Sequence, residues 1–319
     1  MSLNRETWPI AAALHQFATP EVQSSDASSW IATLSEVAGV GFTNIDLTDS
    51  WLRIGDLSPA RLAEFELALV AAGMRVPSLS ITRRSVIDPR AGADNLGYTH
   101  RTLEAAASLG VSVLSLGLHR PLTRAQQDQL WFWNAPGERD PENDPETWAL
   151  AVSRFQEIGR HAADYGMIVS LEMYEDTYLG TADSAVRLVE DVGLDNVGLD
   201  PDLGNLVRLH RPIENWREML DKTLPYANYW QVKNYLRDED PGTGAIFTHP
   251  APLALGFINY RDAIRQALSL GFQGVLCCEH YGGDGLMVSA MNRDYLRTLL
   301  PAAPAVPATA PAVLRGASA

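Results

Sequence analysis

The feature that most constrains the fold is one unit that recurs along the chain: an apolar strand, a polar loop, an amphipathic helix and a glycine. Strands are expected at residues 9–17, 42–48, 75–81, 111–119, 167–174, 196–202, 228–235 and 273–281. Helices are expected after them, at 28–38, 58–72, 92–109, 146–165, 182–192, 213–222, 259–270 and 289–300. Strand and helix in alternation indicate an α/β fold with a parallel sheet, and eight units in one domain indicate a closed (β/α)₈ TIM barrel.

A doubly wound open sheet is the alternative to the barrel. That fold needs a glycine-rich turn after its first strand, and the segment there reads HQFATPEVQSS, without a dinucleotide-binding fingerprint. Glycine is also expected at the end of each helix, because the residue directly after a helix often adopts the left-handed conformation. The glycines expected in this role are Gly39, Gly73, Gly110, Gly166, Gly193 and Gly271.

Two connections are longer than the usual few residues. Residues 120–145 follow the fourth strand and contain LWFWNAP, and residues 236–257 follow the seventh strand. Both lie at the C-terminal mouth of the barrel, the end at which the strands finish, where lids and substrate walls are expected. We expect one barrel domain at 1–302 and a flexible Ala/Pro-rich tail at 303–319.

The composition disfavours several classes of partner. The 319 residues include 25 Lys and Arg against 39 Asp and Glu, a formal charge of −14 that repels nucleic acid. The N-terminus has no signal-peptide pattern, and no apolar run approaches the ~18 residues of a membrane helix. Cys277 and Cys278 are neighbours on a strand and point to opposite faces, so a disulfide is not expected. These features are typical of a cytoplasmic protein.

Polar residues stand at the ends of four successive strands. Glu172 ends the fifth strand, Asp200 the sixth, Gln231 the seventh and Glu279 the eighth. Each residue alone has a structural alternative, such as a helix cap, an ion pair or a hydrogen bond. Together they converge at the mouth, where three carboxylates repel one another unless a divalent cation lies between them. Oxygen donors suit Mn²⁺ or Mg²⁺, so a shared metal site is the favoured interpretation.

Three histidines lie near the expected mouth. His119 ends the fourth strand and is either a structural loop residue or a general base. His15 ends the first strand and is expected to line the pocket. His249 lies in the long connection after the seventh strand and is expected to close over the site.

Further candidates follow the seventh strand and the fourth. Lys233 shares a strand face with Gln231 and is positioned to stabilise a developing enolate. Arg237 follows at the mouth as a candidate substrate contact. Trp133 and its neighbours Trp131 and Phe132 either stack on a substrate or anchor their loop.

This set of residues resembles the sugar isomerase/epimerase superfamily of xylose-isomerase-like barrels. The resemblance implies that Glu172 and Glu279 are both metal ligands and acid/base catalysts, with Asp200 as a third ligand. The seventh strand of the family reads His-x-Lys-Asp with an Arg six residues after the His, a spacing that Gln231, Lys233 and Arg237 keep. Three positions depart from the family's epimerases: Gln231 replaces a ligand His, Leu203 a substrate-binding His and Tyr178 a second Glu.

The resemblance implies metal-assisted proton abstraction next to a sugar carbonyl. Reprotonation of the enediolate gives an isomerase or epimerase, whereas expulsion of a β-substituent gives a lyase. The departures favour elimination or a larger substrate, as in inosose dehydratases or in the catalytic subunits of bacterial C-glycoside deglycosidases, which cleave 3-keto-C-glycosides with a small partner subunit. We therefore expect a sugar or glycoside as ligand, and a homo-oligomer or a complex with a small subunit.

Two other classes are less favoured. An endonuclease-IV-type phosphodiesterase needs a metal cluster with more histidines at the strand ends, and the acidic charge also opposes it. A non-catalytic sugar-binding barrel would need no metal, so metal content distinguishes it.

Overall fold

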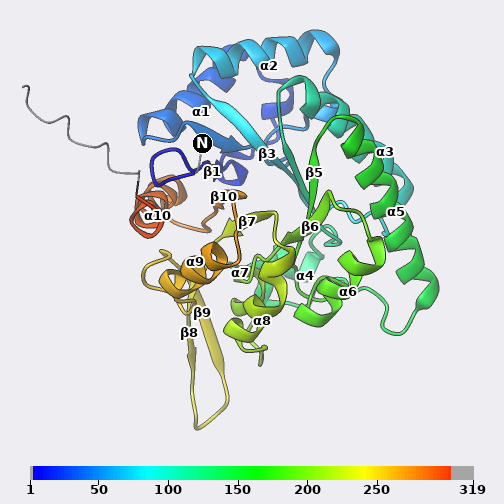
Figure 1. The fold of residues 1–319 in the computed structure, drawn as a ribbon, viewed down its shortest axis with the longest axis vertical. Coiled ribbons are helices and arrows are strands. Elements are labelled where there is room, and N and C mark those ends of the chain that lie inside the picture. Colours follow the sequence, from blue (N-terminus) through cyan, green and yellow to red (C-terminus); the bar gives the residue numbers. More distant parts are fainter. Residues whose placement is uncertain (1–2, 303–319) are drawn as a thin grey trace, which may run out of the picture.

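The computed structural model describes residues 3–302, which form one eight-stranded parallel sheet surrounded by helices (Figure 1). Its strand order is β6-β5-β4-β3-β2-β1-β10-β7. The strands are β1 (Ile10–Ala13), β2 (Asn44–Asp46), β3 (Arg75–Ile81), β4 (Val113–Leu116), β5 (Ile168–Glu172), β6 (Val197–Asp200), β7 (Tyr229–Val232) and β10 (Val275–Cys278). All eight predicted strands are present; β3 has the predicted bounds and the other seven are shorter.

The two ends of this sheet, β6 and β7, meet and close the barrel. Leu199 and Ala227 form a parallel bridge between them, and the N–H of Asn228 donates to the carbonyl of Leu199 at 3.2 Å. Gly198 lies at this seam, where a Cβ atom would come within 2.5 Å of the Asn228 side chain and 2.6 Å of the Tyr226 carbonyl. The predicted (β/α)₈ barrel is thus confirmed, with its narrowest seam between β6 and β7.

The eight predicted helices are also present. They are α1 (Ala27–Gly39), α2 (Pro59–Ala71), α3 (Gly92–Ser108), α5 (Pro145–Asp164), α6 (Ala182–Val192), α8 (Trp216–Thr223), α9 (Tyr260–Ser269) and α10 (Gly285–Leu299). Most start at a side-chain cap, as at α2, where Ser58 Oγ accepts the N–H of Arg61. Five of the six predicted left-handed glycines have positive φ, but Gly39 is the last helical residue of α1, and Gly41 takes the left-handed turn.

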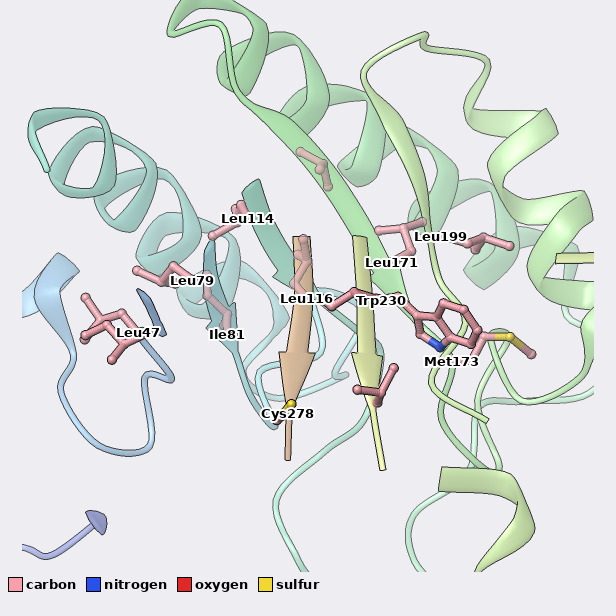
Figure 2. Packing of buried hydrophobic residues seen from close by; sticks show 14 of the residues in the cluster. Leu47, Leu79, Ile81, Leu114, Leu116, Leu171, Met173, Leu199, Trp230 and Cys278 are labelled. Atoms are coloured by element: carbon pink, nitrogen blue, oxygen red, sulfur yellow. The ribbon is translucent and has the colours of Figure 1, made fainter. Parts of the chain in front are cut away.

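The core has two layers because strand side chains alternate between the faces of the sheet. Apolar side chains on the outer face pack beneath the helices, and Figure 2 shows part of this layer, including Leu79, Leu114 and Leu199. Mostly small and medium side chains fill the inside of the barrel, together with the large ring of Tyr229. The inner cluster consists of Ala11, Ala13, Val113, Tyr229, Val275 and Cys277. Both cysteines are buried and free, as expected.

The two long connections contain secondary structure that the sequence pattern missed. The segment after β7 is an antiparallel hairpin, β8 (Asn234–Glu239) with β9 (Ile246–Ala251), which projects from the barrel (Figure 1). The sequence pattern assigned no strands to the connection at 236–257, because a hairpin there depends on cross-strand pairing of the chain with itself. The segment after β4 carries two short helices, α4 (Arg124–Gln127) and the 3₁₀ turn η4 (Phe132–Asn134).

Two further expectations concern the ends of the chain and membranes. The Ala/Pro-rich tail at 303–319 lies outside the described residues. Within residues 3–302, none of the helices has the length and apolar character needed to cross a bilayer.

The seam predicts the effect of a single methyl group. Gly198→Ala should lower the free energy of unfolding by about 1–3 kcal/mol, because the new Cβ overlaps Asn228 and the Tyr226 carbonyl. The matched control is Gly39→Ala, where a Cβ meets nothing within 4 Å, so stability should stay the same or rise. Urea denaturation measures both. Equal stability of the two variants would contradict the close packing at the seam.

Candidate active site

The four polar strand-end residues meet at the mouth of the barrel. Glu172 and Asp200 are the last residues of β5 and β6 and are direct partners in the parallel register. Gln231 lies on β7, and its N–H donates to Asp200 Oδ1 at 2.8 Å. Glu279 directly follows β10, next to β7 in the sheet. All four are buried at the strand ends to which the sequence pattern assigned them.

Lys233 joins this group from the segment between β7 and β8. Its ammonium Nζ donates to Asp202 Oδ2 at 2.5 Å and to Glu279 Oε2. Gly204 makes room for its stem, because a Cβ there would lie 2.3 Å from Lys233 Cγ. Burial opposes the charge, but the two carboxylates raise the pKa of Lys233 well above its ordinary value. The site therefore contains a permanent buried cation at its centre.

The ammonium makes the two glutamates differ in charge. Burial raises the pKa of Glu172 to about 8, and no ammonium donates a hydrogen bond to it; Asn205 Nδ2 does so, to Oε1 at 2.8 Å. Burial acts most strongly on Glu279 and would raise its pKa, but the charges of Lys233, His15 and Arg208, with the hydrogen bond from Lys233, together outweigh burial and lower the pKa to about 2. Glu279 is thus the more acidic of the two side chains, and without a bound cation Glu172 is the one that more readily holds a proton. Burial and the neighbouring carboxylates likewise raise the pKa of Asp200 well above its usual range.

His119 lies beside Glu172, with 4.0 Å between His119 Nε2 and Glu172 Oε2. Its ring stacks on Tyr174 at a centroid distance of 4.4 Å. Gly117 is required for this placement, because a Cβ there would approach His119 Nδ1 to 2.7 Å. Burial, and then the charges of Arg83 and Arg208, hold the pKa of His119 well below its ordinary value. The imidazole is therefore neutral at neutral pH.

Two more predicted residues lie at the site. His15 Nδ1 is 3.6 Å from Glu279 Oε1, and His15 Nε2 contacts the carbonyl of His280 at 3.0 Å. Trp133 is buried, and its ring packs edge to face against Tyr235 and Tyr281. Its indole N–H donates to Thr248 Oγ1 at 3.3 Å, which fixes the β4 loop over the mouth. Trp133 therefore anchors and covers the site in this structure.

Arg237 and His249 do not join the group. The guanidinium of Arg237 donates to the backbone carbonyls of Val207, Leu209 and Arg211 instead of facing the carboxylates. His249 is exposed on β9, opposite exposed Leu236 in the antiparallel register. Both residues belong to the β8–β9 hairpin, which sets these contacts.

Other site residues were missed by the sequence analysis, and they come from one short stretch after β6. Asp202 binds Lys233, Asn205 orients Glu172, and Arg208 is completely buried. Arg208 Nη2 donates to both oxygens of Glu175, at 2.9 and 3.0 Å. The signal was the polar run DPDLGN directly after the strand. It folds into the short helix α7 (Gly204–Val207), which turns these side chains toward β5 and β7.

The oxygen donors suit a hard cation. Asp200 Oδ2 and Gln231 Oε1 are buried and have no hydrogen-bond partner, which is costly unless a ligand compensates. Carboxylate and amide oxygens are the donors that Mg²⁺ and Mn²⁺ prefer. Within the described part of the chain no three His, Cys, Asp or Glu side chains are already arranged as a metal cluster, and Lys233 lies against Glu279. The donor set therefore fits a cation at Asp200 and Gln231, with Glu172 and Glu279 beside it.

Comparison with known proteins places these features in context. Residues 34–299 match the family model described as a xylose isomerase-like TIM barrel. A xylose isomerase-like TIM barrel protein from Mycobacterium smegmatis, solved in complex with magnesium, is 45% identical, with a TM-score of 0.90 over 93% of this chain and 98% of that one.

More distant structures share the fold. A xylose isomerase domain protein from Planctomyces limnophilus is 17% identical with a TM-score of 0.65, over 92% of this chain and 96% of that chain. The 3-keto-D-glucoside 4-epimerase of E. coli is 15% identical with a TM-score of 0.65, over 91% of this chain and 99% of that chain. No functionally curated protein matches the chain.

The buried ion pairs predict that the two lysines of the chain, Lys222 and Lys233, contribute very differently to the free energy of unfolding. Lys233→Met should lower the free energy of unfolding by about 3–5 kcal/mol, because it leaves two buried carboxylates without their cation. Lys222→Met is the control; its ion pair with Asp183 is at the surface, so the urea midpoint should not change measurably. Equal midpoints for the two variants would show that the buried ion pairs are not structural.

Proposed function

Because the chain belongs to the xylose isomerase-like TIM barrel family, we propose that it is a divalent-metal-dependent enzyme that abstracts the proton next to a sugar carbonyl, as isomerases and epimerases do. The observation that carries this proposal is the meeting of four oxygen donors at the ends of β5, β6, β7 and β10. A neutral imidazole and a buried ammonium lie beside them. These are the groups that the reaction needs: a base, a cation for the oxyanion, and ligands for a Lewis acid.

The proposed metal is Mg²⁺ or Mn²⁺, held by Glu172, Asp200, Gln231 and Glu279. When bound, such an ion polarises a sugar carbonyl and makes the neighbouring proton more acidic. The magnesium in the structure of the Mycobacterium smegmatis protein supports this choice, since that protein is 45% identical. The two buried oxygens that lack hydrogen-bond partners, on Asp200 and Gln231, support it independently.

The protein's own side chains provide the proton transfer and the charge. His119 is neutral and buried, and Nε2 lies 4.0 Å from Glu172 Oε2, so proton transfer between the two side chains needs only a small movement. Asn205 holds Glu172 in its orientation. The Lys233 ammonium provides a fixed positive charge for the oxyanion that develops as the proton leaves. The aromatic cover formed by Trp133 and Tyr281 keeps water from these groups.

A second candidate is elimination by the same proton abstraction, as in a dehydratase or a 3-keto-glycoside lyase. Two positions favour it. Leu203 is buried in the apolar core and offers no polar contact to a free ketose. Tyr178 is turned outward, where its hydroxyl donates to the carbonyl of Pro141 at 3.1 Å. The reaction would then expel a substituent of the sugar in place of returning an isomer.

The proposed reaction predicts exchange of the α-proton with solvent. In deuterated water with Mg²⁺ or Mn²⁺, the enzyme should incorporate deuterium into 3-keto glycosides and only weakly into free ketoses, as followed by NMR. His119→Ala should slow exchange by roughly 10²-fold, and Glu172→Gln should nearly abolish it. Glu66→Gln, on the exposed face of α2, is the control and should exchange at the normal rate. An isomer as product identifies an epimerase and a released aglycone a lyase, whereas no exchange with any substrate would refute the proposal.

The proposed metal site predicts that replacing Gln231, but not Gln129, lowers the affinity for Mn²⁺. Calorimetric titration with MnCl₂ should show one high-affinity ion per chain, and Gln231→Leu should weaken binding by roughly 10- to 100-fold because one ligand is lost. Gln129→Leu is the control, because Gln129 is exposed and lies outside the site. Prior treatment with chelator should abolish proton exchange, and added Mn²⁺ should restore it. Full activity of chelated, metal-free enzyme would refute the metal site.

A further inference from the structure

Two neighbouring cavities extend from the candidate active site toward the surface. The inner cavity, about 180 Å³, is lined by His119 and Tyr174. The outer cavity, about 680 Å³, lies between the β4–α5 and β5–α6 connections. The residues common to both walls are Arg139, Asp176, Thr177 and Arg211. The two cavities therefore share a wall, and together they outline a path from His119, the proposed base, past the Asp176 ion pairs to the surface.

Strained backbone concentrates along this path. Among residues 3–302, the non-glycine residues with positive φ are Arg83, Asn143 and Asp176, with φ of 55°, 57° and 60°. Arg83 lines the inner cavity, Asn143 the outer cavity, and Asp176 both. Such conformations cost of order 1–3 kcal/mol for most side chains and cluster at ligand sites. Asn and Asp adopt this conformation readily, so Arg83 is the position where the backbone is most unusual.

The outer cavity has the size of a small-molecule site and the inner cavity does not, since such sites typically enclose about 300–1,000 Å³. A ligand whose reacting end lies at His119 and that fills this path is therefore larger than a single ring. Between the cavities lie the side chains of Arg139 and Arg211, which form ion pairs with Asp176 at 3.4 and 2.9 Å. Both arginine side chains are partly exposed, so they can move aside for such a ligand.

The lining of the outer cavity suits a sugar ring. Trp148 and Tyr178 supply two aromatic rings in edge-to-face contact, with centroids 5.0 Å apart. Planar polar groups surround them, among them Arg139, Asn143 and Asp144. Aromatic rings pack against the apolar C–H face of a sugar, while guanidinium, amide and carboxylate groups bond its hydroxyls in pairs. The mixture of both charges also disfavours a simple anion or cation as the occupant.

We propose that the outer cavity is a second sugar-binding subsite, so that the substrate is a disaccharide or a larger glycoside whose non-reacting ring lies against Trp148 and Tyr178. This inference rests on the proposed function in one respect only, namely that the reacting ring of the substrate faces His119. The outer ring would contribute binding energy without taking part in the chemistry. Leu203 and Tyr178 would then leave free ketoses poorly bound, in agreement with the weak exchange expected for them.

The test compares sugars that the enzyme does not turn over. Calorimetric titration of the full chain with glucose, cellobiose, maltose and trehalose, with and without magnesium, should show at least one disaccharide binding about tenfold more tightly than glucose. Trp148→Ala should remove this advantage, so that the disaccharide binds no more tightly than glucose, because it deletes one aromatic wall. The control Tyr165→Ala removes a half-exposed aromatic ring that directly follows α5 and lines neither cavity, so it should bind like the wild type.

A second variant covers the case in which Trp148→Ala unfolds, since the Trp148 indole also donates to Asp191. Glu142→Trp adds bulk at an exposed position of the outer cavity and should lower disaccharide affinity alone. Disaccharides that bind no more tightly than glucose, or that are unaffected by both variants, would overturn the subsite. Disaccharide preference without proton exchange on any substrate would instead refute the proposed function and leave the subsite standing.

Discussion

The parallel register of the barrel is the constraint on which the candidate site depends. Strands that run side by side in one direction must end at the same mouth, so residues at equal positions in neighbouring strands become neighbours in space. Glu172 and Asp200 are direct partners in this register, and the N–H of Gln231 bridges to Asp200 across the seam between β6 and β7. That seam is made by a single bridge, and Gly198 allows the chains to approach there.

Carboxylates that converge in a buried site repel one another, and the ammonium of Lys233 reduces this repulsion. Lys233 contacts Asp202 and Glu279 but makes no hydrogen bond to Glu172. One glutamate is consequently ionised while the other has a raised pKa, and the nearby imidazole is kept neutral by burial. Two chemically identical side chains thus acquire different protonation states, which is how a site provides both an acid and a base. The unpartnered oxygens of Asp200 and Gln231 remain as donors for a cation.

The loops decide which substrate reaches this chemistry. The aromatic segment after β4 is fixed over the mouth by Trp133, so access from directly above is restricted. The cavities open to the side, between the connections that follow β4 and β5. Strained backbone at Arg83, Asn143 and Asp176 lines this lateral path. Loops of this kind, carried on a rigid barrel, are where substrate specificity is usually set.

The sequence by itself determined the barrel and the four strand-end residues, because both depend on periodicity along the chain: strand, helix and the inward alternation of side chains. It also indicated His15, His119 and Lys233, which follow strands directly and so have little freedom of position. It misplaced Arg237 and His249, because antiparallel pairing of β8 with β9 depends on contacts between segments and not on local pattern. Only the tertiary structure assigned Asp202, Asn205 and Arg208 to the site and joined the β4 and β5 connections into one path, since both results require residues distant in sequence to meet.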